Sequence, residues 1–425
     1  MGIRFESLGS AAKQLRGRGG WYWARVVVVS CLGLLLSRWL SDNSPRWAQG
    51  MQLPVYQVLS TSGPREAEFQ HLAIVEITDE EFWKGELAGR RPVKRAYIAN
   101  LVTHLCNQGA QVVALDFDLR SPLPDGSLLN HPDYKEETDT LARAIQRTPP
   151  SCKIVLARTL HCPDPPAGAC TSEPSVLDSY AFDANRVSWG YINLPADARQ
   201  IPLRRANVAH GTLDSFAQAI AIADSPQLAA KLRLPQDFRY GSFISVKAFE
   251  DAHAVFTAQD VLRDTSTGSA DLMHKTVVVG GAWHANEYGR GLLIDSHAAP
   301  VGPVPGVFLH ANYAAALLDG RAYPQASRAF SVVVDVLALA LVAVIFALPA
   351  SWARRWTRIA MFAVILGVVS YLFWQNLGVF LEITVPVILL LCHALVDEYL
   401  EMREELVALR QKVAAQPGRI QTRSR

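Results

Sequence analysis

Charged residues are scarce in this chain of 425 residues, where they make up 19% of the total and leave a formal net charge of +2. Nucleic-acid binding relies on a concentrated basic surface, so the composition does not support it. The chain also lacks a Gly-x-Ser-x-Gly elbow, a Walker lysine loop and a Gly-x-Gly-x-x-Gly fingerprint. We therefore predict a non-enzymatic protein with no catalytic residues and no cofactor.

Cysteine is also infrequent, since six residues in 425 are too few for a disulfide scaffold. Cys162 and Cys170 bracket the short loop PDPPAGA, and this spacing favours a disulfide bond between them. Cys106 lies in a helical pattern, where we expect a buried, unpaired thiol. Cys152, Cys162 and Cys170 lack the close Cys-x-x-Cys spacing of a zinc site, so no metal is predicted.

Long apolar runs, by contrast, are plentiful near the end of the chain. Between Phe330 and Val396, three runs are separated by the basic patch ASWARRWTR and by the short break QNLG. Each run approaches the ~20 residues that a helix needs to cross a bilayer. Residues 329–396 are therefore predicted to hold three transmembrane helices.

The beginning of the chain predicts a fourth span. Residues 1–20 are basic, and residues 21–41 form an apolar stretch with tryptophans at its ends. A cleaved signal peptide is the alternative. The long basic start, the flanking aromatic residues and the lack of a small-x-small cleavage site favour a retained helix.

The positive charges set the predicted topology, since basic segments remain in the cytoplasm. Both termini and the patch containing Arg354, Arg355 and Arg358 then lie inside. Residues 42–328 lie outside the inner membrane, in the periplasm of a Gram-negative bacterium. We thus expect a multi-pass protein of the bacterial inner membrane whose large domain is extracytoplasmic.

Short β-branched runs alternate with amphipathic helical patterns through residues 42–328. The runs predicted as strands are 72–78, 112–118, 153–158, 187–194, 243–248 and 276–281, and the predicted helices are 94–106, 136–146, 213–223 and 307–318. This alternation predicts a mixed α/β domain with a largely parallel sheet, joined to an all-α membrane region of four transmembrane helices.

Ligands of open α/β sheets settle at the carboxyl ends of the strands. The residues that the pattern places there are Asp79, Asp116, Asp118, Gly280 and Gly281. Asp116 and Asp118 would share one side of an extended strand, where two carboxylates can bind a cation or share a proton. Loop capping, or pairing with an arginine such as Arg95, is the alternative role for both.

Several segments resemble the CHASE2 family of extracytoplasmic sensor domains. They are IVEITDEEF (74–82), the Gly-x-x-P-x-x-Arg segment ending at Arg95, the strand VVALDFD, and the segment 274–321. The resemblance implies a sensory input module whose ligand is unknown. It also adds Arg95, Asp295 and His310, which lie in these segments, to the candidate ligand-binding residues.

Members of this family commonly carry a kinase or cyclase output domain, whereas residues 397–425 are too few for one. Apolar residues in this segment recur at spacings of 3, 4, 3 and 4, which predicts a short coiled coil. They are Tyr399, Met402, Leu406, Leu409 and Val413. A solvated, fraying extension is the alternative, and the basic end of the chain is expected to be disordered or bound to the membrane surface.

Together these patterns predict a sensor or signalling subunit of the inner membrane. An unknown periplasmic ligand would act through the spans and the coiled coil on a separate cytoplasmic or membrane output protein, and a homodimer is the default oligomer. A structural or scaffolding component of an envelope complex is the alternative. An exported enzyme using Asp79, Asp116 and Asp118 is a third reading.

Overall fold

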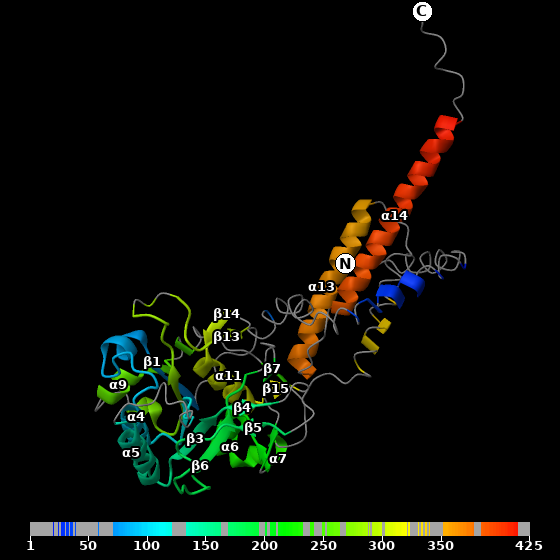
Figure 1. The fold of residues 1–425 in the computed structure, drawn as a ribbon. Helices are drawn as coiled ribbons and strands as arrows, with labels where there is room; N and C mark the ends of the chain where they lie inside the picture. The colour runs from blue at the N-terminus through cyan, green and yellow to red at the C-terminus, as the bar shows by residue number, and fades with distance from the viewer. Residues whose placement is uncertain are drawn as a thin grey trace, which may run out of the picture. The chain divides into compact units, whose positions relative to one another are not determined.

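The computed structural model describes most of residues 71–323 and the helices 352–377 and 384–414 (Figure 1). The described residues are 71–120, 133–162, 169–194, 200–201, 205–209, 211–232, 239–241, 249–250, 253–263, 269–287, 289, 291–299, 302–320, 322–323, 352–377 and 384–414, with scattered positions in 20–58 and 330–340. The chain divides into two compact units, Tyr56–Gln325 and a unit made of Met1–Val55 with Ala326–Arg425.

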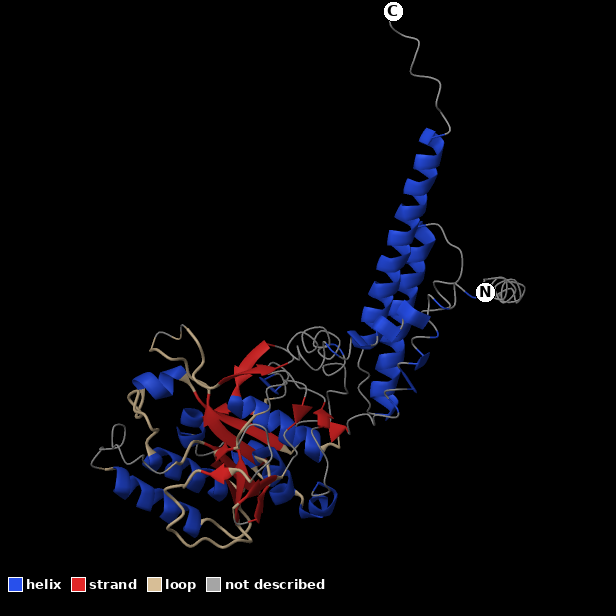
Figure 2. Cartoon of the chain, turned by 45° about the vertical axis from the view of Figure 1, so that its right-hand side comes forward, coloured by secondary structure: helices blue, strands red, loops and turns tan. Residues whose placement is uncertain are grey.

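A six-stranded sheet forms the centre of the unit Tyr56–Gln325 (Figure 2). Its order is β11 (Val255–Thr257), β1 (Leu72–Ile77), β12 (Thr276–Gly281), β2 (Val112–Asp116), β3 (Lys153–Arg158) and β6 (Val187–Tyr191). Each neighbouring pair is parallel. The predicted mixed α/β fold with a largely parallel sheet is confirmed.

Both faces of the sheet are buried because helices cover each of them (Figure 1). Alternate residues of β1 enter two separate cores: Leu72 and Ile74 pack on one face, and Ala73 and Val75 on the other. A strand that is buried on both sides needs a continuous apolar run rather than an alternating one, which explains the sequence LAIVEI.

At least two helices cover each face of the central sheet. On one side lie α4 (Arg95–Asn107), α5 (Tyr134–Arg147) and α9 (Ala258–Arg263), and on the other lie α6 (Phe216–Asp224) and α11 (Gly306–Leu318). Ser215 caps α6, since its side chain accepts a hydrogen bond from the N–H of Gln218. The helix α11 is buried along nearly its whole length, in keeping with its apolar composition.

Shorter elements surround this core. The strands are β4 (Leu160–His161), β5 (Thr171–Ser172), β7 (Gln200–Ile201), β8 (Ala206–Val208), β9 (Gly211–Leu213), β10 (Arg239–Gly241), β13 (Ser296–Ala299), β14 (Gly302–Pro305) and β15 (Ala322–Tyr323). The helices are η1 (Glu80–Lys84), η2 (Pro226–Leu228), α7 (Ala229–Leu232) and α10 (Ser269–Leu272). The small sheets they form are antiparallel. The strand predicted at 243–248 lies outside the described residues.

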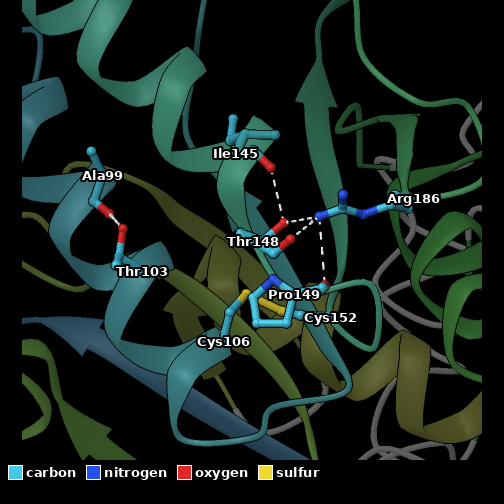
Figure 3. The surroundings of a disulfide bond; sticks show 8 residues. All are labelled: Ala99, Thr103, Cys106, Ile145, Thr148, Pro149, Cys152 and Arg186. Atoms are coloured by element: carbon cyan, nitrogen blue, oxygen red, sulfur yellow. Dashed lines mark hydrogen bonds between the residues drawn. A yellow bond between two sulfur atoms is a disulfide. The ribbon is translucent and has the colours of Figure 1, made fainter.

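Two disulfide bonds connect the four cysteines of this unit. The predicted bond between Cys162 and Cys170 is present. The expectation of an unpaired Cys106 is wrong, because Cys106 at the end of α4 is bonded to Cys152 just before β3 (Figure 3). Arg186 donates to Thr148 Oγ1 at 2.5 Å. The turn between α5 and β3 is therefore fixed both by this hydrogen bond and by the disulfide bond at Cys152.

In the other unit, α13 (Trp352–Leu377) and α14 (Thr384–Ala414) lie side by side (Figures 1 and 2). Phe362 of α13 is buried against Ala394 of α14. Within the described residues, no helix combines the length and the apolar content that a bilayer crossing needs. The four transmembrane helices stay a prediction, and most of the segments 21–41 and 329–351 lie outside the described residues.

Candidate functional site

A cavity of about 380 Å³ opens at the carboxyl ends of the central strands. This is the position at which parallel α/β sheets bind ligands. Five of the residues singled out from the sequence line this cavity, namely Arg95, Asp116, Asp118, Gly281 and Asp295. They come from α4, from the end of β2, from β12 and from the loop before β13. The fold therefore brings together residues that are up to 200 positions apart in the chain.

Asp116 is the last residue of β2, and only 7% of its side chain is exposed. Its Oδ1 lies 3.9 Å from Nε2 of His310 on α11, and its Oδ2 has no hydrogen-bond partner among the described residues. Burial, and to a lesser extent Asp295, raises the pKa of Asp116 well above its usual value. Burial lowers the pKa of His310 to about 4. Burial thus favours the uncharged form of each side chain, which argues against an ion pair between them.

Asp295 and Asp118 already have charged or hydrogen-bonding partners. Burial opposes the ionisation of Asp295, but His297 and the N–H of Gly306 outweigh it and lower the pKa of this carboxyl. His297 Nε2 lies 2.6 Å from Asp295 Oδ1. The carboxylate also faces the first turn of α11, where the helix dipole favours a negative charge. Asp118 forms an ion pair with Arg120 at 2.5 Å, and not with Arg95.

Arg95 is the most deeply buried cation at the cavity, at 2% exposure. Its Nη1 donates to Thr138 Oγ1 at 2.6 Å, and its guanidinium carbon lies 3.6 Å from the centre of the Tyr134 ring. Burial lowers the pKa of Arg95 to about 10, while Glu137 raises it, so the side chain is charged at neutral pH. Its backbone N–H donates to Glu137 Oε2 at 3.0 Å.

The two glycines at the end of β12 are required by packing. A Cβ atom on Gly280 would lie 2.7 Å from Cβ of Val307, so the glycine lets α11 approach the sheet. A Cβ atom on Gly281 would lie 2.2 Å from the Trp283 ring, so this glycine lets the indole lie against the strand end and form one wall of the cavity.

Three of the predicted residues do not line the cavity: Gly280, Asp79 and His310. Asp79 follows β1 but binds His284 instead, since its Oδ1 accepts from the backbone N–H and its Oδ2 lies 2.7 Å from Nδ1. This contact ties the turn after β1 to the loop after β12. His310 is buried beside Asp116 and is not part of the cavity lining.

Sequence reasoning did not find two further residues of the cavity wall, Arg91 and Trp283. The Trp283 ring stacks on Phe82 with 4.2 Å between the ring centres. The guanidinium carbon of Arg91 lies 5.8 Å from the centre of the same Phe82 ring. Arg91 stands inside the Gly-x-x-P-x-x-Arg segment and Trp283 two positions after Gly281. Their proximity to those motifs is the signal that points to them.

Glu76 is the most unusual acid at this edge outside the cavity. Burial, together with Glu250 and Glu81, raises its pKa to about 7. The unfolded chain loses the Glu76 proton near pH 4.5, whereas the folded chain retains it up to about pH 7. Stability contributed by this group is therefore present below pH 4.5 and is lost as the pH rises towards 7.

Glu76→Gln is expected to stabilise the domain above pH 7, by a free energy of unfolding on the order of 3 kcal/mol, and to leave it unchanged near pH 4. The melting temperatures of both proteins at pH 4, 6 and 8 measure this difference. Glu80→Gln, at an exposed position of η1, is the matched control. Parallel pH profiles for the parent and Glu76→Gln would contradict the assignment.

No group of three or more His, Cys, Asp or Glu side chains suited to a metal ion occurs among the described residues. What the cavity offers is a mixture of one buried acid with a raised pKa, two partnered carboxylates, two arginine side chains and apolar walls. Such a set binds and orients a small molecule through charge, hydrogen bonding and shape.

Residues 26–348, about three quarters of the chain, match the CHASE2 domain. The chain belongs to the CHASE2 domain family. The comparisons with curated proteins and with solved structures gave no match. CHASE2 domains are extracytoplasmic sensory domains, which fits a sensory role for the unit with the parallel sheet. The matched range begins before residue 42 and ends after residue 328, and so extends into both flanking apolar segments.

Proposed function

We propose that this chain is a non-enzymatic sensory subunit of the bacterial inner membrane. Its periplasmic CHASE2 domain detects an envelope stimulus at the cavity, and its helices pass a shift to a separate output protein. The observation that supports this most is the cavity itself, which lies at the strand ends of a CHASE2 domain and whose lining includes five of the predicted residues, from four separate parts of the fold. For such a response the ligand must bind two states of the domain with different affinity.

The membrane part of the proposal rests on sequence. Three apolar runs lie between Phe330 and Val396. The predicted topology puts the basic N-terminal segment and the basic patch ASWARRWTR on the same side of the membrane. Alkaline phosphatase, which is active only in the periplasm, is expected to be active when fused after Gly378 and inactive when fused after Arg425. Activity at both positions would contradict the four-span arrangement.

The proposed output element is the end of α14. This helix runs without a break from Thr384 to Ala414, so a movement of its first half is carried to its second half. Four of the predicted seam residues are exposed, at 53–62%, namely Tyr399, Met402, Leu406 and Leu409. The side chain of Val413 lies outside the described residues. Exposed apolar residues at heptad spacing support pairing with a second copy or with a partner helix.

Leu406→Asp combined with Leu409→Asp is expected to convert the dimer into a monomer, because each change places a charge in the apolar seam. Sedimentation of the full-length protein in detergent measures the oligomer. Val407→Asp is the matched control, since Val407 is 46% exposed on the same helix but lies off the seam. A dimer that survives the double change, or one that Val407→Asp also dissociates, would rule out the proposed seam.

A further inference from the structure

The positive charges beside the cavity exceed the carboxylates that are free to balance them. Arg90 binds Glu137 through both of its terminal nitrogens, at 2.5 and 3.0 Å. Glu137 is also the carboxylate that acts most strongly on Arg95. Two guanidinium groups thus share one carboxylate. Within the described part of the chain, the side chain of Arg95 has only neutral direct partners, Thr138 and the Tyr134 ring.

A buried charge without its own counter-ion is costly, so proteins normally pair such groups. Arg95 is 2% exposed, yet it lines the cavity. An anion that enters the cavity would supply the missing counter-charge. Arg91 lines the same cavity from the turn before α4, and places a second guanidinium there.

The acids of the cavity do not oppose such an anion strongly. Asp118 is neutralised by Arg120, and Asp295 lies against His297 and the first turn of α11. Burial raises the pKa of Asp116 and so favours its uncharged form, which repels a negative group less than a carboxylate does. The remaining wall is mostly apolar, and includes Ile98, Phe117, Leu119, Ile192 and Ile294.

We infer that the cavity binds a small organic acid, with its carboxylate paired to Arg95 and Arg91 and its apolar body against the wall residues. This inference rests on the proposed sensory function, because it names the ligand class of the same cavity. Guanidinium groups suit a carboxylate through paired, charge-assisted hydrogen bonds. An amine would meet two cations and would need Asp116 in its ionised form.

Isothermal titration calorimetry on the full-length protein in detergent tests the ligand class. The probes share one body and differ in their head group: phenylacetate and 3-phenylpropionate, the corresponding amides, and the corresponding amines. We expect the carboxylates to bind, the amides to bind about 10-fold or more weakly, and the amines to show no heat of binding.

Variants then locate the carboxylate. Arg91→Gln and Arg95→Gln are each expected to weaken carboxylate binding about 10- to 100-fold, the range for losing one hydrogen-bonded charge. Arg91 is exposed, so its variant tests the site even if Arg95→Gln fails to fold. Arg143→Gln on α5, outside this cavity, removes the same charge and is expected to change nothing.

The outcomes are distinct. If the amines bind and Asp116→Asn abolishes their binding, the ligand class is wrong while the cavity remains the sensory site. If no carboxylate binds better than its amide, or if Arg91→Gln and Arg95→Gln both leave carboxylate binding unchanged, the inference is overturned. The sensory proposal is judged separately, because the tests on α14 do not involve the cavity.

Discussion

Replacing Cys106 and Cys152 with alanine is expected to lower the free energy of unfolding by about 4 kcal/mol, because the bond closes a loop of 46 residues in the unfolded chain. The bond joins the end of α4 to the start of β3, so it fixes a covering helix to the central sheet (Figure 3). An extracytoplasmic domain folds in an oxidising compartment, where such a bond persists.

The bond between Cys162 and Cys170 supplies the control. It closes a loop of 8 residues, so the same treatment predicts a loss of only about 2.5 kcal/mol when both cysteines become alanine. Urea unfolding of each full-length variant, followed by near-ultraviolet circular dichroism, gives the two free energies. An equal loss for the two pairs, or a larger loss for the short loop, would contradict the prediction.

Gly190→Ala is expected to destabilise the domain by about 3 kcal/mol or more, because the added methyl group has no room. A Cβ atom at this position would lie 2.5 Å from the backbone Cα of Phe216, at the start of α6. A backbone atom cannot rotate away as a side chain can, so α6 must leave the sheet. Thermal unfolding of the full-length variant measures the loss.

Gly281→Ala is the matched comparison for this change. Its added methyl group would meet the ring of Trp283, a side chain that is able to turn towards the cavity. The expected loss of stability is therefore smaller than for Gly190→Ala, whereas the cavity becomes narrower. A larger loss of stability for Gly281→Ala than for Gly190→Ala would contradict the expectation that the backbone contact between β6 and α6 is less tolerant than the side-chain contact with Trp283.

The central sheet was readable from the sequence because its strands are buried on both faces. The runs KIVLAR and TVVVGG coincide with β3 and β12, and LAIVEI with β1. The edge strand β11 was not predicted, since three residues, Val255–Thr257, are too few to show a pattern. Predicted helix ends differ by a few residues, as expected where capping rather than periodicity sets them.

The candidate site was only partly predictable. The positions of Asp116 and Gly281 in the site could be predicted from the ends of their strands, because parallel strands place their carboxyl ends at one edge of the sheet. The same reasoning placed Asp79 in the site, but a tertiary contact with His284, 205 positions away, determines its position. The bond between Cys106 and Cys152 likewise depends on which helix packs beside which strand. Local sequence patterns carry no information on such pairings.

The central claim, that a sensory domain acts through α14 on a separate protein, is tested most directly by affinity purification of the tagged full-length chain from detergent-solubilised membranes. The parent chain is compared with a chain ending at residue 396, with the Leu406→Asp and Leu409→Asp double variant, and with Val407→Asp. The account predicts one cytoplasmic or membrane output protein that copurifies with the parent and with Val407→Asp, and is lost from the other two. Exported envelope proteins that remain bound after truncation would contradict it and identify the chain as a scaffold component.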